Sequence, residues 1–138
     1  MKRIAPGLVA AALCLTVQAA LADVVAIVAA QSPITSLTSA QISDVFLGKL
    51  TRLADGTRPL PIDQTEGSAT RDAFYLQIAG KSPAQMKAFW SKLIFTGRGR
   101  PPKAVADDLA VLKSVQENPV AIGYLDRRSV NASVRIQP

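Results

Sequence analysis

The 138-residue chain contains no histidine and a single cysteine, Cys14. Without imidazole and thiolate groups, the usual ligand sets for zinc and copper cannot be assembled. A Ser-His-Asp triad or a Cys-His pair is excluded for the same reason. A carboxylate pair remains in Asp107-Asp108, but these residues lie at an expected helix start, where the helix dipole favours acidic side chains. We therefore expect no metal, no cofactor and no enzymatic activity.

Charge is scarce at the beginning of the chain, where Lys2 and Arg3 are the only charged residues before position 23. An apolar run from Gly7 to Val17 follows, and the small residues of Ala20-Leu21-Ala22 come after it. A basic start, a short apolar centre and an Ala-x-Ala site predict a secretory signal peptide over residues 1–22. The alternative is a membrane anchor, but the run is shorter than the roughly 20 apolar residues that a spanning helix needs.

Cleavage after Ala22 would leave residues 23–138 as a chain without cysteine or histidine. Leu13 precedes Cys14 where a lipoprotein would carry a small residue, so we expect this cysteine to leave with the peptide. The remaining length suits one domain with an ordinary core and no disulfide framework. Of 16 basic residues, two lie in the peptide; the other 14 against 10 acidic residues give a net charge of +4. This excess modestly favours anionic partners.

Apolar patterns in residues 23–138 predict strands that alternate with helices. Val24–Ala29 is continuously apolar and rich in β-branched residues, which is typical of a strand buried inside a mostly parallel sheet. Thr38 or Ser39 should cap a helix that ends near Gly48. Further helices are expected over 68–80, from Ser82-Pro83 onward and over about 105–116, and further strands over 60–63, 120–125 and 133–136. Pro59 and Pro61 argue against a long or central strand at 60–63. The alternation predicts a single α/β domain, a three-layer sandwich.

The helix that begins at Ser82-Pro83 carries Met86, Trp90 and Leu93 at helical spacing. Apolar residues at this spacing usually face the core, although a tryptophan can also stack on a ligand. We expect Trp90 to pack in the core.

The motif EGSATR, residues 66–71, joins a predicted strand to a predicted helix. The first turn of a helix has unpaired N–H groups and a partial positive charge. Gly67 allows close backbone approach, Ser68 and Thr70 add hydroxyl donors, and Arg71 adds a fork suited to phosphate or carboxylate. Because open α/β sheets bind ligands where strands end, these residues could hold an anion.

The competing interpretation is that Ser68 only caps the helix, because serine is common at helix starts. Arg71 could equally point into solvent or pair with Glu66. Glu66 itself would place a negative charge where an anion would lie.

The segment LTSAQISDVFLGKLTRLADGTRPLPIDQTEGSATRDAF resembles the second lobe of periplasmic phosphate-binding proteins of ABC transporters. The later segments FWSKLIFTGRGRPPKAV and VQENPVAIGYLD resemble that family's tryptophan-containing loop and a following strand, in the same order. The similarity covers nearly all of residues 24–126. It implies a type II periplasmic-binding-protein-like fold. At 116 residues after cleavage, only one lobe of the two-lobed clamp would be present.

The resemblance implies ligand contacts from the hydroxyl groups of Ser68 and Thr70 and from the backbone at Gly67 and Ala69. Ala69 replaces the second glycine of the family's glycine-serine-glycine-threonine turn. Gln64 replaces the family's phosphate-binding arginine, four residues before the serine, and is a further candidate contact. Arg71 has no established family role and is a candidate from its chemistry alone.

Two functions follow from this resemblance. The first is a periplasmic solute-binding protein for phosphate or a similar oxyanion, linked to ABC-type uptake through a permease or completed by a second copy. The second is a shortened accessory or interaction module that has lost high-affinity binding. A single lobe leaves one side of the ligand in water, where electrostatic contacts are weaker. We expect no nucleic-acid partner and no membrane insertion after cleavage.

Overall fold

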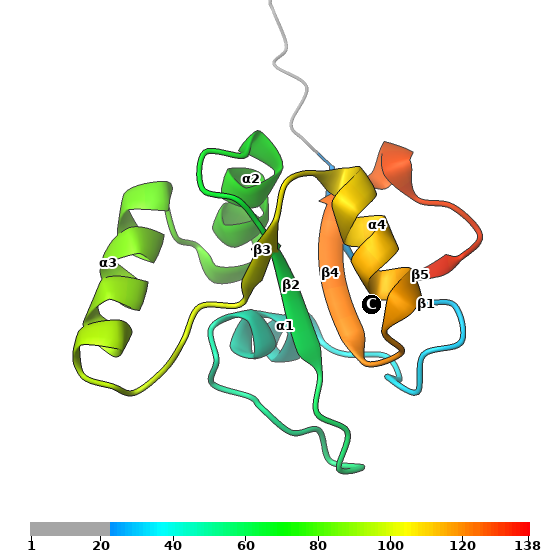
Figure 1. Cartoon of the computed structure of the whole chain (residues 1–138), viewed down its shortest axis with the longest axis horizontal. Helices are drawn as coiled ribbons and strands as arrows, with labels where there is room; N and C mark the ends of the chain where they lie inside the picture. The colour runs from blue at the N-terminus through cyan, green and yellow to red at the C-terminus, as the bar shows by residue number, and fades with distance from the viewer. Residues whose placement is uncertain (1–22) are drawn as a thin grey trace, which may run out of the picture.

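The computed structural model describes residues 23–138, a five-stranded sheet with helices on both faces (Figure 1). In chain order the elements are β1 (Val24–Ala29), α1 (Ser39–Phe46), β2 (Leu60–Gln64), α2 (Ala69–Ala79), α3 (Pro83–Phe95), β3 (Lys103–Val105), α4 (Asp108–Glu117), β4 (Ala121–Asp126), the 3-10 helix η1 (Arg127–Ser129) and β5 (Val134–Gln137). The predicted signal peptide, residues 1–22, lies outside the described residues. Within residues 23–138, no helix is both long enough and apolar enough to cross a membrane.

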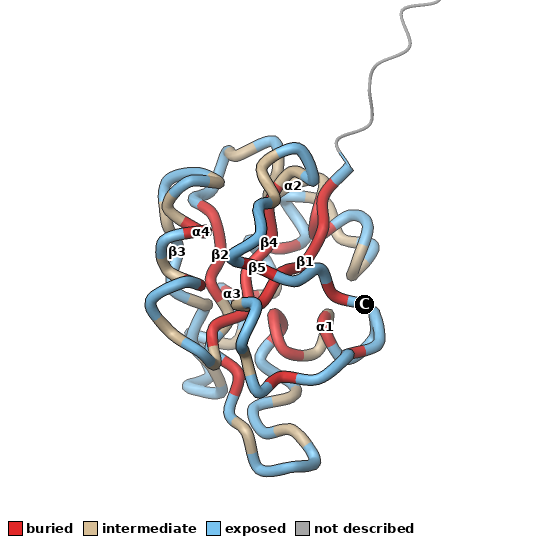
Figure 2. Tube along the Cα trace, turned by 90° about the vertical axis from the view of Figure 1, so that its right-hand side faces the viewer, coloured by how far each residue is buried: buried red, intermediate tan, exposed pale blue. Residues whose placement is uncertain are grey.

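Two apolar cores lie on opposite faces of the sheet, because successive strand residues point to opposite sides. Val24, Ala26 and Val28 of β1 pack in one core with residues of α1, α2 and α3. Val25 and Ile27 pack in the other core with residues of α4. Figure 2 shows the buried central strands surrounded by more exposed segments. The predicted three-layer α/β sandwich is confirmed.

The sheet is mixed, with the strand order β3-β2-β4-β1-β5. β2 is parallel to both β3 and β4, but β1 is antiparallel to both β4 and β5. β1 is buried as expected, but its assignment to a mostly parallel sheet is wrong. A strand covered on both faces carries the same apolar run whichever way its neighbours point, so the run does not report direction.

β2 has a neighbour on each side, although its prolines argue against a central strand. The pairing register explains how they are accommodated. β4 pairs with Leu60 and Pro61, whereas β3 pairs only from Ile62 to Gln64. Pro61 therefore lies where β2 has a neighbour on one side only, a position that tolerates a missing N–H donor.

The segment before α4 differs from the sequence-based expectation. Residues 103–105 form the short edge strand β3, in place of a loop that leads into a helix at about residue 105. α4 begins only at Asp108, because the side chain of Asp107 caps it by accepting a hydrogen bond from the Ala110 N–H at 2.9 Å. Asp107-Asp108 thus has the predicted place at a helix start.

The other helix boundaries follow their capping residues. Thr38 caps α1 and Ser82 caps α3, each as part of a capping box with the glutamine three residues later. Gly80 ends α2 in the left-handed conformation, with φ of 63°. Trp90 is buried in the core beside α1, as predicted.

Candidate functional site at the end of strand β2

The EGSATR motif lies at the carboxyl end of β2 and leads into α2. Ser68 is the N-cap of α2, and its hydroxyl accepts a hydrogen bond from the Arg71 N–H at 3.2 Å. Gly67 has a φ of 92°, in the region that side-chain-bearing residues rarely adopt. The turn borders a broad, open hollow of about 740 Å³, lined in part by Gln64, Gly67, Ser68 and Thr70. Four of the six predicted contacts therefore lie together.

Ala69 and Arg71 are not part of this wall. Ala69 is the exposed first residue of α2. The Arg71 side chain turns toward the interior, with its Nε 3.6 Å from a carboxylate oxygen of Asp63 and its guanidinium 5.2 Å from the centre of the Tyr75 ring. It pairs with neither Glu66 nor a group in the hollow.

Gln64 is buried and fully engaged with protein groups. Its amide nitrogen donates to a carboxylate oxygen of Asp108 at 2.8 Å and to the backbone oxygen of Tyr124 at 3.2 Å. Its amide oxygen accepts from the Ser68 hydroxyl at 2.9 Å. The proton of the Ser68 hydroxyl is therefore already used. Because the Arg71 N–H already donates to the Ser68 hydroxyl, a bound anion would find the other backbone N–H groups of the first turn and the Thr70 hydroxyl.

Three carboxylates line the same hollow: Glu66, Asp107 and Asp108. Among residues 23–138, no lysine or arginine belongs to its wall. Asp108 is stabilised by donors, because its second oxygen accepts from the Asp126 N–H at 3.2 Å and from the Ser129 hydroxyl at 3.0 Å. The carboxylates oppose the attraction that the N-terminus of α2 exerts on an anion.

The sequence pattern does not indicate that Asp107 and Asp108 lie at this hollow. They follow β3, which pairs in parallel with β2. The carboxyl ends of parallel neighbours meet at one edge of a sheet, so recognising β3 would have placed both aspartates beside the motif.

Behind the hollow, Asp63 forms a buried polar cluster with both tyrosines of the chain. The Tyr75 hydroxyl donates to Asp63 at 2.7 Å, and the Tyr124 hydroxyl donates to its other oxygen. Burial raises the pKa of both phenols, and the charge of Asp63 raises it further. Both tyrosines thus stay neutral and hold Asp63, which in turn holds Arg71.

The architecture is that of one lobe of a type II periplasmic-binding-protein-like fold: a mixed sheet with helices on both faces and the EGSATR turn at a strand end. No protein-family model matches the sequence, and no curated protein is significantly similar to it. Among the solved structures that resemble the chain, three are described as phosphate-transport or possible phosphate-binding proteins.

One is an ABC-type phosphate transport receptor from Vibrio cholerae, with a TM-score of 0.65 and 18% identity over 83% of this chain. Another, from Clostridium perfringens, is described as a candidate phosphate ABC transporter substrate-binding protein with bound phosphate, with a TM-score of 0.61 and 25% identity over 83% of this chain. A possible phosphate-binding protein from Planctomyces limnophilus has a TM-score of 0.61 and 13% identity over 83% of this chain.

The match covers less than half of each of these proteins: 45%, 44% and 40% of their lengths, respectively. The chain therefore has the fold of one part of a larger binding protein. This agrees with the single lobe expected from the sequence.

Proposed function

We propose that residues 23–138 form a periplasmic solute-binding protein for phosphate or a similar oxyanion, linked to ABC-type phosphate uptake. The observation that carries the proposal is the turn at the start of α2. Gly67, Ser68 and Thr70 lie together at the end of β2. One similar structure is described as a phosphate transport receptor, and another, a candidate substrate-binding protein of a phosphate transporter, holds phosphate. Residues 1–22 would act as the export signal, and the permease of a transporter would be the partner.

Affinity for a free oxyanion should be low in the isolated chain. The hollow is open on one side, so water competes for the anion and weakens its electrostatic contacts. Glu66, Asp107 and Asp108 add repulsion. A second copy of the chain, or another protein, could close the hollow and supply the cations that its wall lacks.

The second candidate is an accessory or interaction module of the same fold, without solute binding. The specific observation in its favour is the place of Arg71, which pairs with buried Asp63 and not with a group in the hollow. The Ser68 hydroxyl donates its proton to Gln64, so this proton is not available to an anion, which also favours the accessory module. An enzymatic role is not part of either candidate.

Calorimetric titration of residues 23–138 with phosphate, sulfate and molybdate separates the two candidates. The solute-binding role predicts saturable heat in the millimolar range. Thr70→Val should weaken it about fivefold or more, because one hydrogen bond to a charged group is lost. Thr51→Val, in the exposed loop between α1 and β2, is the matched control and should leave the titration unchanged.

Equal binding by the Thr70→Val and Thr51→Val variants would show that the anion lies elsewhere. The absence of any heat or thermal shift at millimolar anion would instead favour the accessory module.

Export has its own test. Mass spectrometry of protein from the periplasmic fraction should give a chain that begins at Asp23. An acyl chain on Cys14, or an intact amino terminus in the membrane fraction, would overturn the proposed processing.

A further inference from the structure

Helix α3 and the loop after it belong to a segment of the chain that carries basic residues and no acidic ones. Residues 73–106 contain no aspartate or glutamate and six cations: Lys81, Lys87, Lys92, Arg98, Arg100 and Lys103. None of the six forms an ion pair within residues 23–138. Their charges therefore remain free to act on another molecule.

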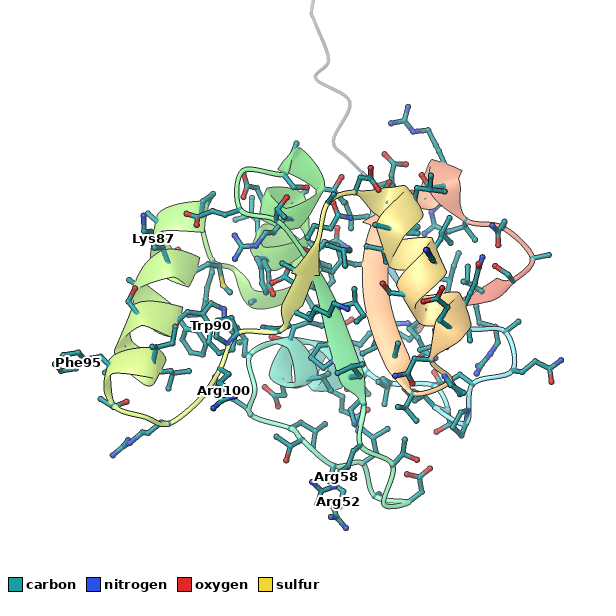
Figure 3. All side chains as sticks on the ribbon, in the orientation of Figure 1. Arg52, Arg58, Lys87, Trp90, Phe95 and Arg100 are labelled. Atoms are coloured by element: carbon teal, nitrogen blue, oxygen red, sulfur yellow. The ribbon has the colours of Figure 1, made fainter. Side chains whose placement is uncertain are left out.

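The carboxyl end of α3 combines these cations with exposed apolar side chains. Phe95 is 92% exposed and Ile94 is 55% exposed. The Arg98 N–H donates to the Leu93 carbonyl at 2.9 Å, which holds this arginine at the helix end. Figure 3 shows Phe95 pointing away from α3 and Arg100 on the loop after the helix. Phe95, Arg98 and Arg100 are called the basic end below.

The hollow at the start of α2 has the complementary composition. Its wall contains the carboxylates of Glu66, Asp107 and Asp108 and, among residues 23–138, no lysine or arginine. It also contains Leu109, whose side chain is 75% exposed. Opposite charges attract across an interface, and apolar side chains that meet there are removed from water. The hollow therefore matches the basic end in both charge and apolar character.

These two surfaces do not meet within one chain. Figure 1 shows the carboxyl end of α3 at one edge of the molecule and the starts of α2 and α4 at the opposite edge. The match is therefore between the basic end of one copy and the hollow of another. An anionic membrane would match the basic end alone, whereas a second copy matches both surfaces.

We propose that the chain self-associates head to tail, with the basic end of one copy docked on the hollow of the next. Phe95 packs on the partner's Leu109, and Arg98 and Arg100 lie against the partner's carboxylates. Contacts between two different surfaces close into rings or extend into filaments. The docked arginines supply the cations that the hollow lacks for an oxyanion. This last step rests on the proposed function, whereas the association does not.

Sedimentation velocity of residues 23–138, without phosphate, measures the association directly. It should rise with protein concentration and fall with added salt, because salt screens charges at the edge of an interface. Glu66→Lys should weaken it about tenfold or more, because a cation in the hollow repels the basic end. Glu117→Lys, at the end of α4 and outside the hollow, is the matched control and should associate as the unchanged chain does.

The apolar contact has its own pair of variants. Phe95→Ser should weaken association about tenfold, because a large apolar side chain is no longer buried between copies. Leu76→Ser, on α2 and outside the wall of the hollow, is the matched control, since Leu76 is 63% exposed. It should leave association unchanged.

Mixing two variants distinguishes head-to-tail docking from other arrangements. The Glu66→Lys chain keeps its basic end, and an Arg98→Gln/Arg100→Gln chain keeps its hollow. Each alone should remain largely monomeric, whereas an equimolar mixture should form a one-to-one dimer. This dimer should not grow further, because its two free surfaces are the altered ones.

Three results would overturn the proposal: a monomer at every concentration, equal association of the Glu66→Lys and Glu117→Lys variants, or a mixture without the one-to-one dimer. Binding of a chain that stays monomeric to phosphatidylglycerol vesicles would also overturn it and would assign the basic end to a membrane surface. Because phosphate is absent from these measurements, failure here is distinct from failure of the oxyanion site, which its own titration decides.

Discussion

Asp63 determines where the arginine of the EGSATR motif points. It is 3% exposed and accepts hydrogen bonds from the hydroxyl groups of Tyr75 and Tyr124. A buried charge is tolerated only when it is paired and hydrogen-bonded. Asp63 therefore draws the Arg71 side chain inward, to 3.6 Å. An arginine in a motif that the sequence predicts to bind an anion can thus stabilise the core instead.

The buried tyrosines predict a loss of stability in alkali. The pKa of Tyr75 and of Tyr124 is raised by burial and by Asp63, whereas in the unfolded chain both ionise near pH 10. The folded state therefore holds protons that the unfolded state releases. Their contribution is fully present below pH 10 and should fall above it by about 1.4 kcal/mol per pH unit for each tyrosine.

These are the only two tyrosines, so ultraviolet absorbance of phenolate reports on them directly. Phenolate should appear only together with loss of the native circular dichroism signal. Phenolate at about pH 10 in a chain that is still folded would contradict the burial of the cluster.

Ser68 and Thr70 should differ in their effect on stability. Ser68→Ala removes the cap of α2 and leaves the amide oxygen of Gln64 without its donor. A loss of about 1–2 kcal/mol in the free energy of unfolding is expected. Thr70→Val should be nearly neutral, because Thr70 lies inside the first turn of α2, after the capping residue, where its hydroxyl is not needed for the cap. Ser39→Ala, at the start of α1, controls for serine in a first turn. Denaturant titration gives the comparison; equal losses at Ser68 and Ser39 would refute the capping role.

Helices are the elements that the sequence predicts best, because their ends carry chemical signals. Ser68, Ser82 and Gly80 fix three boundaries through caps that depend only on neighbouring residues. β3 has no such signal: it has three residues and no fully buried position. The sequence does not indicate whether β1 is parallel or antiparallel to its neighbours, because this depends on which distant strands pair with it.

The close packing of α4 on the sheet gives a prediction at the scale of elements. A methyl group added at Gly123 of β4 would lie 2.5 Å from a methyl carbon of Val111 and 3.3 Å from one of Val115. Gly123→Ala should therefore lower the free energy of unfolding by about 1–3 kcal/mol. Gly99→Ala is the matched control, because its nearest neighbours would lie at an ordinary 3.7 Å.

Denaturant titration of both variants tests the contact. Val111→Ala in the Gly123→Ala background should recover part of the loss, so the two substitutions should be less than additive. A Gly123→Ala variant as stable as Gly99→Ala would mean that α4 can move away from β4 at little cost.

At the scale of the whole molecule, the sequence predicts only the part of the candidate site that is continuous in the chain. The turn from Gln64 to Thr70 is continuous in the chain, so its residues are recognised together. Asp108 lies 44 positions from Gln64 and reaches it only through the pairing of β2 with β3. The charge of the hollow is therefore a property of the fold that the net charge of +4 in residues 23–138 does not indicate.

The opposed signs of the net charge and the local charge make salt dependence a decisive measurement. If phosphate responds mainly to the excess of basic residues, added salt will weaken its binding. If phosphate binding depends mainly on the charges that line the hollow, salt will screen the repulsion from Glu66, Asp107 and Asp108 and strengthen binding. We expect the second result, because the three carboxylates are the charges nearest to the anion, no lysine or arginine lies in the wall among residues 23–138, and salt screens carboxylates that face an open hollow.

Glu66→Gln isolates this effect, because Glu66 is exposed and has no ion-pair partner within residues 23–138. Phosphate should bind this variant more tightly at low salt, and the gain should shrink as sodium chloride is raised from about 0.01 M to 0.15 M. At each salt concentration, the difference between the two proteins reports the charge of Glu66. Glu117→Gln, at the end of α4 and outside the hollow, is the matched control. Should Glu66→Gln and Glu117→Gln change phosphate affinity alike at every salt concentration, phosphate does not bind beside the EGSATR turn.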